Sequence, residues 1–227
     1  MDLEYTIKKS SKRRKLTISV ERDSKVIVHV PEGTSAEKIE KVIESKRQWI
    51  FEKIRHAQKY KKRPHAPGKE LVSGESALYM GRSYQIEILK IDLEKVDFKN
   101  KFLIPQHLRT EGREVLRDWY IEKAKERIIP RVKRIAQDLG VDYSEAKIVD
   151  NKYRWGSCTP KNNVHLNWRL IKAPMFVIDY VIVHELAHLI EPNHNDRFWN
   201  IVRTHNPNAE KAKEWLKSNG QLLEEVV

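Results

Sequence analysis

The feature of the sequence that most constrains its folding is an apolar stretch, residues 174–191, with three polar residues at its centre. This stretch predicts a helix with aliphatic and aromatic side chains on nearly all of its sides. Such a helix belongs in the interior of a fold. His184, Glu185 and His188 nevertheless lie in its middle. Because burying these polar groups without partners costs several kcal/mol, something in the folded protein must satisfy them.

A metal ion shared between histidines can satisfy them. His184 and His188 are separated so that both side chains project from one face of the helix. Pro192 then ends the helix, and the following turn can return His194 as a third nitrogen ligand. Three nitrogens leave a fourth tetrahedral position open, which is typical of a catalytic zinc site rather than a structural one. The spacing therefore predicts one Zn2+ ion per chain.

Glu185 adds a chemical role to this predicted site. It is rotated by about 100° from His184 around the helix, beside the ion without having to bind it. There it can accept a proton from a water that zinc has acidified and pass that proton to a leaving amine. The pattern predicts a zinc metallopeptidase with Glu185 as general base. Two simpler interpretations stay open: a core helix whose histidines hydrogen-bond internally, and a structural metal site, which would not need the glutamate.

Composition limits the setting of the protein. The chain has 227 residues, of which 40% are hydrophobic, enough for one large domain or a small domain plus a catalytic one. No apolar run approaches the roughly 18–20 residues that span a bilayer, and the first residues lack the apolar core of a secretory signal. The single cysteine, Cys158, fits a reducing compartment. We expect a cytoplasmic protein without membrane contacts, in which Cys158 is an inert thiol rather than a nucleophile or an inhibitory zinc ligand.

The positive charge is concentrated near the N-terminus. Residues 1–65 hold 18 basic and 9 acidic residues, a net charge of +9, whereas the whole chain has a net charge of +12. The clusters "KKSSKRRK" and "KYKKR" can neutralise phosphates with little sequence preference, so nucleic acid is an expected partner of this region. An ordinary solvated surface in a basic protein explains the same clusters equally well.

Local patterns before residue 106 predict short strands around one helical region. Alternation of apolar and polar residues predicts the strands, and a run at helical spacing predicts the helix. Two prolines and a glycine among charges mark a linker. The predicted elements are a hairpin (15–31), a helix (from Thr34 or Ser35 to about Tyr60), the linker (61–70) and short strands (77–89 and 95–105).

After residue 106 the predicted elements are mainly helical. A long helix begins near Gly112 and ends at Gly140, with Pro130 expected to kink or divide it. A second hairpin follows, then the apolar helix, and two short helices close the chain, the last one stopped by Gly220. We expect an α+β fold with an N-terminal basic β-rich accessory region (1–105) and a catalytic domain (106–227).

Four motifs make the sequence similar to a known family. They are "RWGSC" (154–158), "LNWRLI" (166–171), "DYVIVHELAHLIEPNHNDRFW" (179–199) and "EWLK" (214–217). They resemble the YgjP-like predicted metallopeptidases, which are relatives of the WLM and SprT/Spartan-type zinc proteases. The resemblance extends over nearly the whole chain and is most specific in the last third.

The resemblance implies zinc ligands at His184, His188 and His194, with Glu185 as catalytic base. It also implies a zincin-like fold with a backing helix, a small twisted sheet and an active-site helix. In such proteases an edge strand pairs with an extended polypeptide substrate, and "RWGSC" or its hairpin partner is the candidate here, with an ordinary packed hairpin as the alternative. The substrate-binding candidates are Arg154, Trp155, Gly156, Ser157 and Asn167.

The sequence departs from the metzincin pattern and leaves the oxyanion-stabilising residue open. Glu191 stands where metzincins have a glycine between the second and third ligands, and no Met-turn follows the site. The residues that could stabilise the oxyanion are Arg154, Tyr153, Asn167 and His205.

Two rival functions follow from the same residues. A metal-dependent endoribonuclease of the three-histidine type shares the ligand spacing, and positive charge suits an RNA substrate. A non-catalytic nucleic-acid-binding module with a vestigial metal site is the other alternative. Glu185 argues against both, because that nuclease type lacks a glutamate after the first histidine and a retained ion alone would not require a base.

Overall fold

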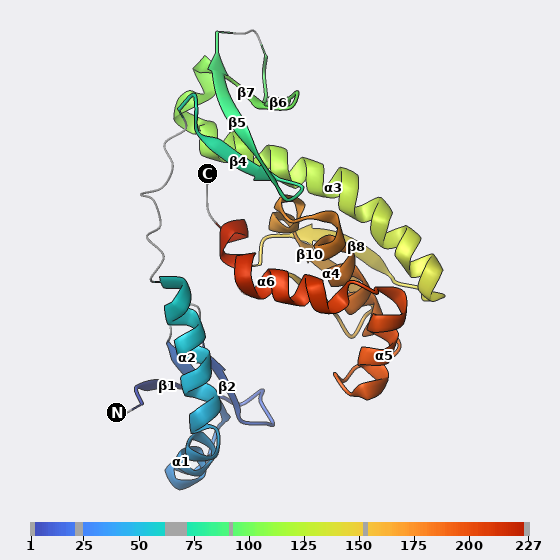
Figure 1. Ribbon diagram of the computed structural model, residues 1–227. Coiled ribbons are helices and arrows are strands. Elements are labelled where there is room, and N and C mark those ends of the chain that lie inside the picture. Colours follow the sequence, from blue (N-terminus) through green and yellow to red (C-terminus); the bar gives the residue numbers. More distant parts are fainter. Residues whose placement is uncertain (1–2, 21–24, 62–71, 91–92, 152–153, 225–227) are drawn as a thin grey trace. The chain divides into compact units, whose positions relative to one another are not determined.

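A computed structural model describes residues 3–20, 25–61, 72–90, 93–151 and 154–224 of the chain. The described residues form a mixed α/β structure with three small sheets and six α-helices (Figure 1). The chain divides into two compact units, residues 1–65 and 66–227. Within the described residues, no helix is both long and apolar enough to cross a membrane.

The first unit is a three-stranded sheet with two helices. The strands are β1 (Tyr5–Ser10), β2 (Thr17–Val20) and β3 (Val26–Pro31), in the order β1-β3-β2. β2 and β3 are antiparallel, which confirms the predicted hairpin, and β1 is parallel to β3. The valines of β3 pack with isoleucines of α1 (Ala36–Ser45) and with Ile50 of α2 (Arg47–Lys61).

The helical region of this unit is divided where the sequence predicted one continuous helix. α1 ends at Ser45, and the backbone angles of the cap residue Lys46 (φ −109°, ψ 5°) leave the helical region. The Ser45 hydroxyl donates to the Val42 carbonyl at 2.8 Å. A serine that bonds back to its own helix in this way competes with the helical backbone pattern, which favours a break at this position.

Residues 72–105 belong structurally with the second unit. They form β4 (Ser76–Tyr79), β5 (Arg82–Leu89), β6 (Asp97–Phe98) and β7 (Phe102–Pro105), in the order β4-β5-β7-β6. The Phe102 ring meets the Trp119 ring edge-to-face at 5.0 Å, so this sheet shares its core with the long helix that follows. The sequence pattern predicted a boundary at 105/106, whereas the structure divides the chain at 65/66. The linker predicted at 61–70 lies almost entirely outside the described residues.

The long helix α3 (Gly112–Leu139), which follows a short 3-10 helix (Gln106–Glu111), runs unbroken through Pro130. Pro130 and Glu126, whose carbonyl loses its helical partner, both lie on the exposed side, where water can satisfy that carbonyl. The expected division of the helix therefore does not occur. Gly140 ends the helix in the left-handed conformation at φ 66°, as predicted.

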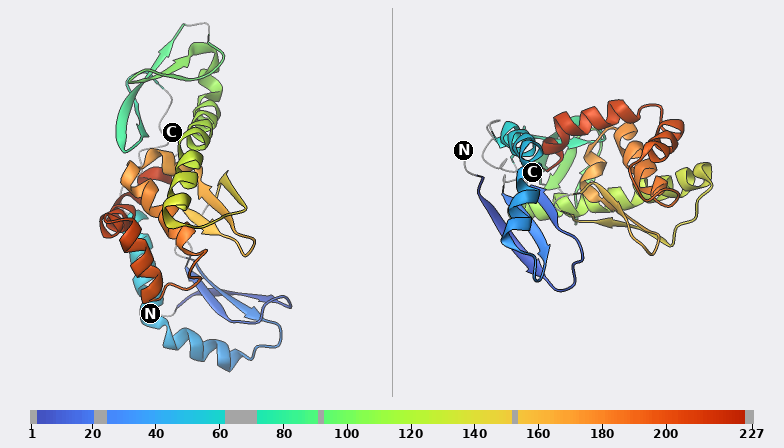
Figure 2. Two further views of the ribbon diagram at one scale, coloured as in Figure 1. Left: turned by 90° about the vertical axis from the view of Figure 1, so that its right-hand side faces the viewer. Right: turned by 90° about the horizontal axis from the view of Figure 1, so that it is seen from below.

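The third sheet and the last three helices complete the second unit (Figure 2). β8 (Glu145–Val149), β9 (Gly156–Cys158) and β10 (Asn163–Asn167) have the order β8-β10-β9, with β8 parallel and β9 antiparallel to β10. A second 3-10 helix (Trp168–Lys172) leads to α4 (Met175–Ala187). α5 (Asp196–His205) and α6 (Ala209–Glu224) follow.

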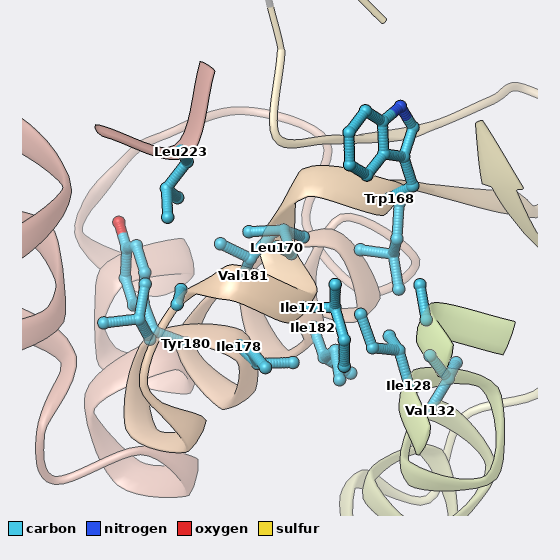
Figure 3. Packing of buried hydrophobic residues seen from close by; sticks show 14 of the residues in the cluster. Ile128, Val132, Trp168, Leu170, Ile171, Ile178, Tyr180, Val181, Ile182 and Leu223 are labelled. Carbon is cyan, nitrogen blue, oxygen red and sulfur yellow. The ribbon is translucent and has the colours of Figure 1, made fainter. Parts of the chain in front are cut away.

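α4 is buried on nearly every side, as its composition predicted. Ile178, Val181 and Ile182 of α4 pack between Ile128 and Val132 of α3 and the second 3-10 helix (Figure 3). The helix ends at Ala187, four residues before the predicted end at residue 191.

The predicted stop at Gly220 is wrong, because α6 continues through it to Glu224. A Cβ atom at Gly220 would lie 3.3 Å from Cζ2 of Trp155. The glycine therefore lets the helix pass close to the indole ring and does not end the helix.

Candidate metal centre

Three histidines converge at the C-terminal end of α4. His184 lies in its last turn, and His188 is the cap residue, with angles (φ −66°, ψ −17°) that continue the helix by one position. His194 lies just before α5, which begins where the Asn195 side chain accepts the Phe198 N–H at 3.0 Å. One ligand atom from each histidine lies within 4.8 Å of the others. The structure thus brings together the three side chains that the sequence singled out.

The three rings are suited to a cation that prefers nitrogen. Nε2 of His184 and Nε2 of His194 are 3.1 Å apart, close to the spacing of about 3.3 Å that zinc–nitrogen bonds of about 2.0–2.1 Å require in a tetrahedron. Nδ1 of His188 lies 3.3 Å from the Glu191 carbonyl, which directs the other ring nitrogen of His188 toward the cluster. Burial and the other two rings lower the pKa of His184 to about 4, so its imidazole is neutral and can act as a ligand.

The Phe198 ring packs against the rings of all three histidines. Its side chain is fully buried, and its ring centroid is 4.9 Å from that of His184, 4.6 Å from that of His188 and 4.7 Å from that of His194. The half-buried Trp199 packs against Phe198 and against two of the histidines. These aromatic residues restrict the rotation of the imidazoles and thereby hold the cluster together.

Glu185 lies on the side of α4 that faces β9. Its side chain is 7% exposed. A Cβ atom on Gly156 would lie 2.6 Å from both Cγ and Oε1 of Glu185, and the Cys158 N–H donates a hydrogen bond to the Glu185 carboxylate. Burial raises the pKa of Glu185 to about 7, while the Arg154 guanidinium and the Cys158 N–H act in the opposite direction. A carboxyl group with such a pKa can exchange a proton near neutral pH.

β9 forms an edge of its sheet, and its outward backbone groups can be identified. The Asn167 N–H donates to the Trp155 carbonyl at 2.8 Å, so these two residues form a hydrogen-bonded pair. Such pairs alternate along an antiparallel ladder. Ser157 therefore bonds toward β10, whereas the N–H and C=O groups of Gly156 and Cys158 point away from it. β10 lies between two strands, so β9 alone of the two candidate strands has an edge in the described sheet.

Comparison with known proteins identifies the family. A family model described as "YgjP-like, metallopeptidase domain" matches residues 14–219. The chain belongs to the YgjP-like metallopeptidase family. No curated protein matches it. Among solved structures, it is similar to the metallopeptidase zymogen abylysin of Pyrococcus abyssi, with 19% identity and a TM-score of 0.39, over 41% of this chain and 95% of the other.

Membership in this metallopeptidase family supports a metal-dependent hydrolase and implies a divalent metal. Within the described residues, the cluster of His184, His188 and His194 is the group of histidine, cysteine and acidic side chains placed to bind one. The Cys158 thiol is not part of this group, and burial and the nearby Glu185 raise its pKa. A thiol in that environment stays protonated, in keeping with the inert role expected from the sequence.

Asn167 is placed as a structural residue and not as a substrate contact. Its side chain is 1% exposed. Nδ2 donates to the carbonyls of Asn151 and Arg154, at 2.7 and 3.1 Å, and Oδ1 accepts the Arg169 N–H at 3.0 Å. These hydrogen bonds of the Asn167 amide therefore hold the segment that leads into β9 in place. No part of the amide is available to a substrate.

The other oxyanion candidates differ in position. Arg154 is exposed directly before β9 and acts electrostatically on Glu185. His205 is exposed at the far end of α5, about 14 Å along the helix axis from its first residue, which follows His194 closely. Tyr153 lies outside the described residues. Of the described candidates, Arg154 is the one placed near the carboxylate.

Two residues beside the site were not predicted from the sequence. The Tyr180 ring lies 5.9 Å from the His184 ring, and its position one helical turn earlier could have revealed it. Lys213 of α6 places Nζ 4.9 Å from the Trp199 ring, and its charge contributes to lowering the pKa of His184. No local pattern marks Lys213, because it reaches the site from a separate helix.

Proposed function

We propose that this chain is a zinc-dependent metallopeptidase in which His184, His188 and His194 hold the metal and Glu185 is the general base. The observation that carries the proposal is the 3.1 Å approach of the His184 and His194 ring nitrogens beside a buried carboxylate on the same helix. Zinc is favoured among divalent metals because all three ligand atoms are imidazole nitrogens. When bound, zinc supplies Lewis acidity that polarises a peptide carbonyl and lowers the pKa of water.

Glu185 moves the proton in this proposal. Its carboxylate takes a proton from the attacking water and delivers it to the amine that leaves. The pKa of about 7 suits both steps, since the group accepts and releases a proton near neutral pH. The close approach of Gly156 and the hydrogen bond from Cys158 hold the carboxylate in one position.

The substrate in this proposal is an extended polypeptide. The outward carbonyls of Gly156 and Cys158 and the Gly156 N–H on β9 can pair with such a chain as an added strand, while the Cys158 N–H is taken by Glu185. Arg154 provides a positive charge beside the scissile bond, where it can stabilise the oxyanion. With α3 as backing helix, β8–β10 as the sheet and α4 as active-site helix, the arrangement is zincin-like. The basic N-terminal unit favours polypeptides associated with nucleic acid as the natural substrates.

Elemental analysis and cleavage assays on wild type and Glu185→Gln test this function. We expect about one zinc ion per chain in both proteins. Wild type should cleave unfolded casein, and the variant should be slower by about 10²- to 10⁴-fold, because it lacks the group that transfers the proton. Cleavage by the variant at the wild-type rate, with metal still bound, would show that Glu185 is not the base. Degradation of structured RNA instead of casein would favour the nuclease.

A further inference from the structure

One concentration of positive charge in the N-terminal unit lies at its first two strands. Residues 8–15, called the basic segment below, have the sequence KKSSKRRK and include six cations. All six of these side chains are exposed, and within the described part of the chain none forms an ion pair with an acidic residue. α1 instead alternates acidic and basic residues, and Glu44 pairs with Arg47 at 2.9 Å. The basic segment is therefore a concentration of positive charge that α1 does not share.

The fold gathers the basic segment at one end of the sheet. It covers the end of β1 and the connection to β2, and these two strands lie on either side of β3. Lys8 and Thr17 are both register partners of His29, so all three lie on one face. The Arg13 guanidinium donates to the Thr17 hydroxyl at 2.9 Å, which holds Arg13 near that face. The cations thus span the width of three strands, about 10 Å.

This face lies opposite the helices of the unit. Val26, Val28 and Val30 point to the other face, where they form the core with α1 and α2, and Figure 1 shows α2 lying across the sheet. Successive side chains of a strand point to opposite faces. Thr6, Lys8 and Thr17 are exposed and lie on the face opposite to these valines. The face therefore offers hydroxyl groups and cations, which are the donors that proteins use to contact phosphate oxygens.

We propose that the basic segment and the adjoining face of β1 and β2 bind the phosphate backbone of nucleic acid without reading its sequence. Six exposed cations at one end of the sheet complement a chain of closely spaced negative charges. Arg13 and Arg14 carry planar guanidinium groups that match phosphate geometry. The basic segment contains no apolar residue, whereas a peripheral membrane site places apolar side chains among its cations for insertion. The chemistry of the segment therefore favours nucleic acid over a lipid surface.

Anisotropy with the full chain tests this proposal. The probes are a fluorescent duplex and a single strand of about 20 nucleotides, titrated between about 50 and 200 mM salt. Wild type should bind both, with a logarithmic affinity that falls linearly with the logarithm of salt concentration. The triple variant Lys12→Gln, Arg14→Gln, Lys15→Gln should reduce that slope on duplex by about 2 to 3 and weaken binding at least about tenfold near 100 mM salt.

A matched variant separates this surface from the overall charge. Lys38→Gln, Lys41→Gln and Lys46→Gln remove three exposed cations from the region of α1 and lower the net charge by the same amount. This control should keep the wild-type slope, and circular dichroism should show both variants folded. Equal losses in the two variants would overturn the proposal, as would salt-independent binding or no binding at the lowest salt.

Binding to vesicles that contain anionic lipid is measured as well, to distinguish a lipid surface from nucleic acid. Binding to these vesicles without binding to either oligonucleotide would also overturn the proposal, in favour of a lipid surface. The assays measure binding and no turnover, so their failure would leave the proposed peptidase activity untouched. Absence of peptidase activity would likewise not contradict the proposed binding surface.

Discussion

Gly156 shows at the scale of single residues how a missing side chain can define a site. The sequence marked it as one member of the "RWGSC" motif and as a candidate for binding substrate. The structure gives it a different partner, because the space where its Cβ would lie is filled by the Glu185 side chain. Any other residue at this position would displace the carboxylate or move β9 away from α4.

We predict that Gly156→Ala lowers kcat by about 10- to 100-fold, because a displacement of about 1 Å in a catalytic group has effects of that size. The three atoms nearest to the added Cβ all belong to Glu185, so the zinc content should stay at the wild-type level. Steady-state kinetics on a casein-derived peptide and elemental analysis of the same samples measure the two quantities. Unchanged kcat in a folded variant would mean that the position of the Glu185 carboxylate is not set by Gly156.

At the scale of secondary-structure elements, an ion pair joins the backing helix to the helix of the site. Nη2 of Arg131 on α3 donates to Oδ2 of Asp179 on α4 at 2.6 Å, and Nε donates to the other carboxylate oxygen. Each side chain is 23% exposed. The hydrogen bonds that Arg131 donates to Asp179, followed by the charge of Asp179, raise the pKa of Arg131 against the opposing effect of burial. The pair fixes how α4, and therefore the histidine cluster, lies against α3.

We predict that Asp179→Asn lowers the free energy of unfolding by about 1–3 kcal/mol, because it leaves the partly buried guanidinium without a charged partner. Arg131→Met alone should also destabilise the protein, and the double variant should lose less than the sum of the two single changes. Urea denaturation of all four proteins measures this coupling. Strict additivity would indicate that the pair contributes nothing beyond its separate side chains.

At the scale of the whole molecule, the two units differ in what each can support alone. The second unit has an extensive core that continues from the β4–β7 sheet through α3 and α4 to α6. Among the described residues of the first unit, six buried side chains form a core between the sheet and two helices. The histidines, Glu185 and β9 all lie within the second unit. The site and the proposed nucleic-acid surface are therefore carried by separate parts of the chain.

We predict that a fragment of residues 66–227 folds on its own, binds about one zinc ion and keeps peptidase activity on short peptides. Its thermal unfolding should remain a single cooperative transition, because its core is complete within the fragment. Calorimetry, elemental analysis and peptide cleavage measure these properties. A fragment that begins instead at residue 106 should fail to fold, since it lacks the sheet that packs on Trp119 and Tyr120. Normal folding of the shorter fragment would support the boundary at 105/106.

Much of the local structure could be predicted because it depends on neighbouring residues. The β2–β3 hairpin, the buried helix with its histidines and the glycine end of α3 each follow from periodicity or from the conformational preference of one residue. The errors lie where distant packing overrides a local signal. Gly220 looks like a helix stop but makes room for Trp155. Pro130 has a different explanation: it does not divide α3, because its side of the helix is exposed to water.

The sequence by itself determined which residues could share a metal, since helical spacing and the turn after Pro192 bring the histidines near one another. Only the tertiary structure decided how the surrounding residues are used. It buried the Asn167 amide in the chain leading to β9, brought Gly156 against Glu185 and carried Lys213 to the site from another helix. These contacts join residues far apart in the chain, so their geometry depends on the packing of whole elements, and no local pattern encodes it.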